Sequence, residues 1–145
     1  MKRLLLSVLV LCPVAAAADV PCWARDYDAA HLAAHPDQRV VSITLGPSTV
    51  SGTVDGETVH RLVVRLRGPV TVATATAYCS GTGAMDCGVE GDGGVFTLTP
   101  DGASVLLRVG EYGLWLEGPA DAVELSGTSG DDRVFRLDPA VCRLD

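Results

Sequence analysis

Residues 58–67 read TVHRLVVRLR, and this stretch decides the fold class. Two sets of side chains alternate along it, one made of His60, Leu62, Val64 and Leu66 and the other of Arg61, Val63, Arg65 and Arg67. Successive side chains of a β-strand point to opposite faces of the sheet. A period of two with one apolar set therefore predicts a strand that buries one of its faces.

Segments of strand-like composition continue on both sides of this stretch, separated by glycine, proline and aspartate. They are RVVSITL (39–45), STVSGTV (48–54), VTVATATAY (70–78), GVFTLT (94–99), ASVLLRV (103–109), YGLWLEG (112–118), DAVELSG (121–127) and DRVFRLD (132–138). Asp55–Gly56 and the tripeptide at 100–102 are hairpin turn signals. Eight or nine short strands at intervals of about 8–12 residues predict an all-β fold, either an antiparallel β-sandwich or a small β-barrel of about eight strands.

One segment departs from the period of two. Residues 26–38 read DYDAAHLAAHPDQ, and this alanine-rich composition favours a helix. Asp26 or Asp28 can cap its N-terminus, and Pro36 ends it. We therefore expect one short N-terminal helix, of roughly two to three turns at most, attached to a single β domain that spans residues 19–145.

The N-terminus has the pattern of a secretory signal peptide. A basic pair precedes an apolar run, residues 4–14, and Ala16 and Ala18 form an A-x-A cleavage site. The run is shorter than the roughly 20 residues that a membrane-spanning helix needs. We therefore expect residues 1–18 to be cleaved off, which leaves a periplasmic or secreted domain with no membrane span.

Composition limits the class of partner. The 145 residues include 11 basic and 18 acidic side chains, which gives a net charge of −7. Without the signal segment nine basic residues remain, all of them arginine. Non-specific nucleic-acid binding needs basic residues that neutralise phosphates, and an anionic membrane surface repels an acidic chain. We therefore expect neither nucleic acid nor a membrane surface as a partner.

Four cysteines, Cys22, Cys79, Cys87 and Cys142, remain after cleavage. An even number of cysteines in an oxidising compartment predicts a disulfide framework. Cys79 and Cys87 flank a glycine-containing segment that can turn back on itself, and Cys22 and Cys142 lie near chain ends that often meet in a domain. We predict the pairs Cys79–Cys87 and Cys22–Cys142. The spacing fits neither a zinc motif nor a C-x-x-C redox motif.

The histidines offer one metal-binding hypothesis. His31 and His35 lie four residues apart on the predicted helix, so both point to one face. With His60 or Asp37 as a third ligand, they would satisfy the minimum that a zinc site needs. The alternative is that both histidines are solvated near the C-terminal end of the helix, where a positive charge suits the helix dipole.

A second hypothesis concerns anions. Arg61, Arg65 and Arg67 share one face of the predicted strand in an otherwise acidic chain. Arginine forks suit phosphate and carboxylate groups, so these residues are a candidate anion-binding strip. The alternative is a solvated face that pairs with acidic residues on neighbouring strands.

The remaining polar segments predict no chemistry. The sequence has no G-x-S-x-G elbow for a serine nucleophile and no cofactor motif. The position of His60 on the apolar face of its strand predicts that it is a core or rim residue and not a catalytic base. Residues 126–135 read SGTSGDDRVF, which predicts a turn tightened by Asp131 and Asp132.

These observations favour an exported, monomeric β domain that binds a protein or a small ligand, as a binding or inhibitory module. Its contact surfaces would be the loop between Cys79 and Cys87 and the turns near residues 91–94 and 127–132. The alternatives are a periplasmic metal-binding protein that uses His31 and His35, and an enzyme of unrecognised type. A catalytic set is not apparent in the sequence, so the non-catalytic class is preferred.

Overall fold

The computed structural model describes residues 19–49, 56–69 and 71–143. The predicted signal peptide, residues 1–18, lies outside the described residues, as do most of the predicted strand at 48–54 and the first residue of the Asp55–Gly56 turn. Within the described residues the chain forms one short helix and nine strands. Their bounds are β1 (Asp19–Asp26), α1 (Ala29–Ala34), β2 (Val40–Pro47), β3 (Glu57–Leu66), β4 (Thr71–Ser80), β5 (Met85–Val89), β6 (Gly94–Asp101), β7 (Ser104–Leu116), β8 (Val123–Leu125) and β9 (Val134–Arg143).

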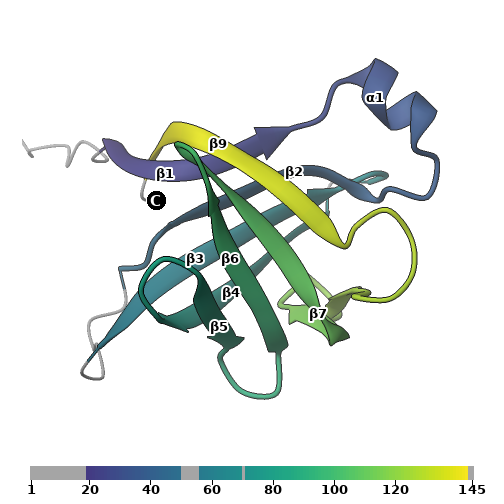
Figure 1. Ribbon diagram of the computed structural model, residues 1–145. Coiled ribbons are helices and arrows are strands. Elements are labelled where there is room, and N and C mark those ends of the chain that lie inside the picture. The colour runs from purple at the N-terminus through teal and green to yellow at the C-terminus, as the bar shows by residue number, and fades with distance from the viewer. Residues whose placement is uncertain (1–18, 50–55, 70, 144–145) are drawn as a thin grey trace, which may run out of the picture.

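Eight of these strands form a closed antiparallel barrel (Figure 1). Each strand from β1 to β7 pairs with the next, β7 also pairs with β9, and β9 returns to pair with β1. The short strand β8 pairs with β7 and lies outside the closed ring. Of the two predicted architectures the barrel is therefore the one observed, and its closure removes the free sheet edges that a sandwich would keep.

The period of two in the sequence sorts side chains between the barrel interior and its outer face. Leu62 and Val64 are fully buried, whereas Arg61 and Arg65 on the same strand are exposed. The interior is filled mainly by aliphatic side chains, with Phe96 and Phe135 as the largest. Three alanines of β4, at positions 73, 75 and 77, contribute small side chains to the same core.

Several strands differ from the sequence prediction. The sequence predicts no strand at residues 19–26, but this segment forms β1, which pairs with β2 and β9. The segment between the paired cysteines was expected to be a loop, but Met85 begins strand β5, which pairs with β4 and β6. The segments 103–109 and 112–118 were expected to be separate strands, but β7 is continuous from Ser104 to Leu116. Gly113 adopts a φ of 83° within it, a bend that only glycine makes without strain. The end of β7 thereby reaches β4, where Thr74 and Glu117 exchange backbone hydrogen bonds.

The helix α1 is confirmed, though it is shorter than predicted. Asp28 is its N-cap, and its carboxylate accepts a hydrogen bond from the His31 amide at 2.7 Å. No residue of α1 is buried, so the helix does not rest on core packing. Instead, the Arg67 guanidinium donates hydrogen bonds to the carbonyls of Leu32 and His35, the second at 2.7 Å. Arg67 therefore fastens the C-terminal end of α1 to the barrel.

Both predicted disulfides are present. Cys22–Cys142 joins β1 to β9, with Cα atoms 5.9 Å apart and a sequence separation of 120. Cys79–Cys87 joins the adjacent strands β4 and β5, which the register places directly opposite each other at this pair. The first bond fastens the pairing that closes the barrel, and the second fixes the register of its shortest barrel strand.

The two disulfides should differ in how much they stabilise the fold. A cross-link stabilises mainly by reducing the entropy of the unfolded chain, and the effect grows with the length of the loop that it closes. We expect the double variant Cys22→Ser, Cys142→Ser to lose roughly 5 kcal/mol of the free energy of unfolding, and Cys79→Ser, Cys87→Ser roughly 2.6 kcal/mol. Urea titrations followed by circular dichroism measure both values. Equal losses in the two variants would contradict this explanation.

Candidate functional site

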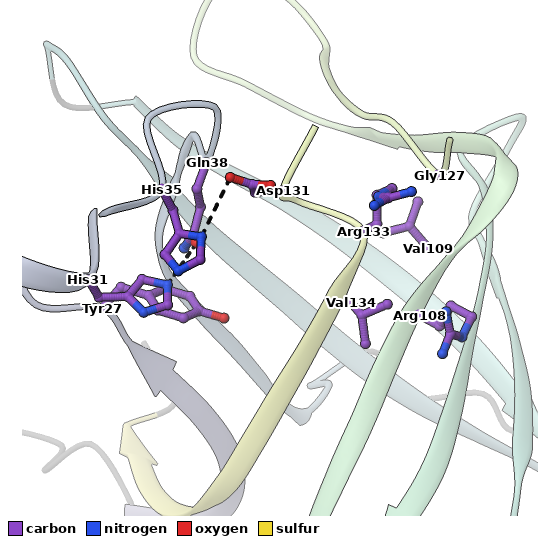
Figure 2. A pocket seen from close by; sticks show the side chains of 10 residues that line it. All are labelled: Tyr27, His31, His35, Gln38, Arg108, Val109, Gly127, Asp131, Arg133 and Val134. Atoms are coloured by element: carbon purple, nitrogen blue, oxygen red, sulfur yellow. Dashed lines mark hydrogen bonds and ion pairs between the residues drawn. The ribbon is translucent and has the colours of Figure 1, made fainter. Parts of the chain in front are cut away.

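A hollow of about 430 Å³ lies between the helix and the segment that joins β8 to β9 (Figure 2). We call it the histidine pocket. Its residues come from three parts of the chain that are distant in sequence. They are Tyr27, His31, His35 and Gln38 around α1, Arg108 and Val109 from β7, and Gly127, Asp131, Arg133 and Val134 from the segment that leads into β9.

Three rings form a stack on one wall of the histidine pocket. The ring centroids of Tyr27 and His31 are 4.6 Å apart, and those of His31 and His35 are 4.3 Å apart, with interplanar angles of 27° and 25°. Residues four apart on a helix lie on the same face, which is why the two imidazoles meet. Figure 2 shows this stack on the side of the pocket opposite Arg108. Burial raises the pKa of Tyr27, so its phenol stays protonated at neutral pH.

Hydrogen bonds fix the orientation of the first imidazole. His31 Nε2 lies 2.9 Å from Gln38 Oε1, and Gln38 Nε2 donates to the Val40 carbonyl at 2.9 Å. Since the Gln38 amide nitrogen is used as a donor, its oxygen accepts from His31 Nε2. Gln38 is itself buried, with 4% of its surface exposed. The tautomer of His31 in this arrangement therefore carries its proton on Nε2.

The second imidazole faces the opposite wall. His35 Nδ1 lies 3.7 Å from Asp131 Oδ2, and the two side chains are 47% and 40% exposed. This contact, drawn as a dashed line in Figure 2, spans the gap between α1 and the segment before β9. An exposed pair of this kind contributes little to stability, so its significance lies in where it places the two groups.

A buried carboxylate holds the far wall in position. Asp132 is 6% exposed, and its two oxygens accept hydrogen bonds from the backbone amides of Arg39 and Val40 at 2.7 and 3.1 Å. Burial raises the pKa of Asp132, and these two amides partly oppose that rise. The sequence predicted that Asp132 tightens its own turn. That prediction is wrong, because its carboxylate binds a segment more than 90 residues away.

Two arginines give the histidine pocket a positive charge. Arg108 and Arg133 line it, and neither guanidinium has a hydrogen bond or ion pair with any other residue that the structure describes. Asp131 is the one carboxylate that lines the pocket. With neutral histidines the lining therefore carries a formal charge of +1, in a chain whose net charge is −7. The pocket is a positive region on an acidic molecule.

Sequence reasoning found the two histidines and missed these two arginines. Arg108 is exposed on β7, and Arg133 lies just before β9. They are brought together because Arg108 pairs with Val134 and the Val109 amide donates to the Arg133 carbonyl at 2.9 Å. This pairing joins strands that are not consecutive in the chain. The one local signal was the predicted turn in the segment 126–135, which contains Arg133.

The other predicted anion site is reduced to two residues. Arg61 and Arg65 are exposed on the outer face of β3, as the alternation predicts. Arg67 is engaged with the two carbonyls at the end of α1. Its guanidinium is therefore not available to an anion in this arrangement, and anion binding by Arg61 and Arg65 stays a prediction.

The metal hypothesis also stays a prediction. The structure confirms that His31 and His35 lie together. His60 and Asp37, the suggested third ligands, do not line the same pocket. In the described parts of the chain, no group of three histidine, cysteine, aspartate or glutamate residues is placed to hold a metal ion.

Comparison with known proteins gives no relative. No protein-family model, no curated protein and no solved structure matches this chain. Among the described residues, no helix has both the length and the apolar character needed to cross a bilayer.

Removal of the Asp132 carboxylate should destabilise the fold. In Asp132→Ala the amides of Arg39 and Val40 lose their acceptors, and a buried donor without a partner costs roughly 1–3 kcal/mol. We expect a loss of about 2–4 kcal/mol in the free energy of unfolding, measured by urea titration. The matched control is Asp131→Ala, which removes an exposed carboxylate and should change stability by less than about 0.5 kcal/mol. Similar losses in both variants would contradict the anchoring role of Asp132.

His60 provides a pH test of the barrel interior. Its Nε2 lies 3.0 Å from Thr58 Oγ1, and burial lowers the pKa of His60. Below about pH 6.5 the unfolded state then binds more protons than the folded state, so stability falls as the pH falls toward the lowered pKa of His60. We expect His60→Gln to flatten the dependence of the free energy of unfolding on pH between about 7 and 5. An unchanged slope would contradict it.

Proposed function

We propose that this protein is an exported, non-catalytic binding module that holds a small anionic ligand in the histidine pocket. The ligand would carry a carboxylate or phosphate group and an apolar part. The two unpaired guanidiniums of Arg108 and Arg133, which line a hollow on an acidic chain, are the observation that carries this proposal.

The chemistry of the lining supports an anion. Hydrogen bonds between arginine and carboxylate or phosphate are among the stronger ones in proteins, because both partners are charged. The Tyr27 phenol adds a neutral donor. A negatively charged ligand would also give Arg108 and Arg133 the charged partner that they lack within the chain.

The remaining surfaces support an apolar part. The stacked rings present flat faces, and Val134, which is 38% exposed, lines the same hollow. Aromatic rings pack well against another ring in a stacked or edge-on arrangement. A hollow of about 430 Å³ falls within the range of roughly 300–1,000 Å³ that is usual for small-molecule sites.

Export is supported by the two disulfides. Such bonds form and persist in oxidising compartments, and small exported domains often depend on them. The signal-like segment at residues 1–18 points to the same compartment. A periplasmic or secreted location, a monomeric state and the absence of nucleic-acid partners remain parts of this proposal, drawn from composition and charge.

A matched set of four compounds tests the ligand class. Phenyl phosphate and benzoate carry the charge and the ring, benzyl alcohol is the neutral analogue, and benzylamine is the cationic one. Isothermal titration calorimetry should give binding of the two anions and weaker or no binding of the other two. Equal affinity for benzylamine and benzoate would contradict the proposal.

The arginines should account for the preference. We expect Arg108→Gln and Arg133→Gln each to weaken phenyl phosphate binding by about tenfold, which corresponds to the roughly 1.5 kcal/mol of one charged hydrogen bond. Arg65→Gln is the control, since Arg65 is exposed on β3 and does not line the pocket. If Arg65→Gln weakens binding as much, the anion is attracted by overall charge rather than held in the histidine pocket.

The alternatives have distinct signatures in the same titrations. Zinc binding that is lost in a His31→Ala, His35→Ala double variant would support the metal-binding alternative. Release of phenol from phenyl phosphate would support an enzymatic role of the pocket. Neither outcome is expected of a binding module.

A further inference from the structure

A second hollow, of about 730 Å³, lies on the outer face of the barrel over β4, β5 and β6. One row of residues runs across it, because the register places Tyr78 opposite Gly88 and Gly88 opposite Val95. We call the hollow that this row crosses the outer groove. It is lined by Glu57, Tyr78, Ser80, Asp86, Cys87, Gly88, Val89, Glu90, Gly91, Val95, Phe96, Thr97 and Gly110. It uses different residues from the histidine pocket, and the two share no lining side chain.

The centre of the outer groove is open because Gly88 has no side chain. A Cβ atom placed on Gly88 would have no heavy atom within 4 Å, so the space above this residue is empty. Tyr78 is half-buried on one side of it. On the other side of this space, Val95 is 53% exposed. Its side chain lies against Gly110, because a Cβ atom placed on Gly110 would be 2.7 Å from Val95 Cγ2. The groove therefore has apolar walls and a backbone floor.

The side chains around this apolar centre are acidic. Glu57, Asp86 and Glu90 line the outer groove, and none of its lining residues is a lysine, an arginine or a histidine. None of the three carboxylates has an ion pair among the described residues. The outer groove thus combines an apolar channel with three carboxylates that have no ion pair among the described residues, which is the charge pattern opposite to that of the histidine pocket.

We propose that the outer groove binds a basic segment of a partner protein, with an arginine or lysine side chain lying in the channel over Gly88. The aliphatic part of such a side chain would contact Val95, since long basic side chains cover apolar surface with their stems. Its charged head would lie near the Tyr78 ring, whose face attracts cations. Glu57, Asp86 and Glu90 would neutralise the charge. Tyrosine and arginine are also the residues that carry much of the energy at protein interfaces.

The Cys79–Cys87 disulfide would hold this surface rigid. It joins the residues that neighbour Tyr78 and Gly88 on β4 and β5, and the two cysteines lie directly opposite each other. The relative positions of Tyr78 and Gly88 are therefore fixed covalently. A pre-organised surface binds more tightly, because less conformational entropy is lost on association.

One substitution fills the channel without changing any charge. Gly88→Leu places a side chain in the open space, and because the φ of Gly88 is not positive, leucine fits the backbone conformation. Val72→Leu is the matched control, since Val72 is exposed on the outer face of β4 and does not line the groove. Circular dichroism and thermal unfolding should show that both variants keep the fold.

A second pair of variants tests the charges. The double variant Asp86→Asn, Glu90→Gln removes two carboxylates from the outer groove. Asp121→Asn, Glu124→Gln is its matched control, because these two exposed acids lie outside the groove and remove the same total charge.

Synthetic tetra-arginine, tetra-glycine and tetra-glutamate peptides serve as probes. Titrations followed by ¹⁵N-edited NMR should show that tetra-arginine alone shifts the amide signals of Tyr78, Gly88 and Val95. We expect Gly88→Leu to weaken tetra-arginine binding about tenfold and Asp86→Asn, Glu90→Gln about three- to tenfold. The two control variants should keep the affinity of the parent protein.

Three outcomes would overturn this proposal. Shifts spread over all acidic surfaces, with equal losses in the groove and control variants, would show attraction by net charge alone. Unchanged affinity in Gly88→Leu would show that the channel is not occupied. Concentration-dependent dimerisation that Gly88→Leu abolishes would assign the outer groove to a second copy of the chain. Arg108→Gln should leave the tetra-arginine result unchanged, so this test is independent of the histidine pocket.

Discussion

The pairing of β1 with β9 is the constraint on which the rest of the structure depends. These strands come from opposite ends of the described chain, and their backbone hydrogen bonds turn an open meander into a closed ring (Figure 1). Cys22–Cys142 fastens the same pairing covalently. Closure leaves every barrel strand with two neighbours, so an aliphatic interior can be buried without a free edge. It also sets the start of β9 beside α1, where the histidine pocket forms.

The histidine pocket is held by polar contacts and not by the core. The helix that carries both histidines buries none of its residues. It is kept in place by its cap at Asp28, by the guanidinium of Arg67 and by the buried amide of Gln38. Asp132 binds the opposite wall to the start of β2. Binding residues are often found on such connecting segments, which a rigid scaffold positions while their own sequence varies freely.

The two proposed surfaces carry charges of opposite sign. Two unpaired arginines line the histidine pocket, although the chain as a whole is acidic. Three carboxylates without ion pairs line the outer groove on β4 to β6. Because like charges repel and opposite charges attract, the two proposed surfaces would select ligands of opposite sign. A small anion at one site and a basic protein segment at the other would not compete for the same residues. The barrel can therefore present both surfaces at once.

The sequence by itself determined the features that depend on near neighbours. Alternation at residues 58–67 predicted which side chains enter the core, a four-residue spacing brought His31 and His35 together, and cysteine positions predicted both disulfides. Only the tertiary structure decided between sandwich and barrel, because both have the same local pattern and differ in which distant strands pair. The same holds for Arg108 with Arg133, for Asp132 with β2, and for the row from Tyr78 to Val95. Those contacts follow from strand register, which hydrogen bonds between separate segments set and which no short stretch of sequence encodes.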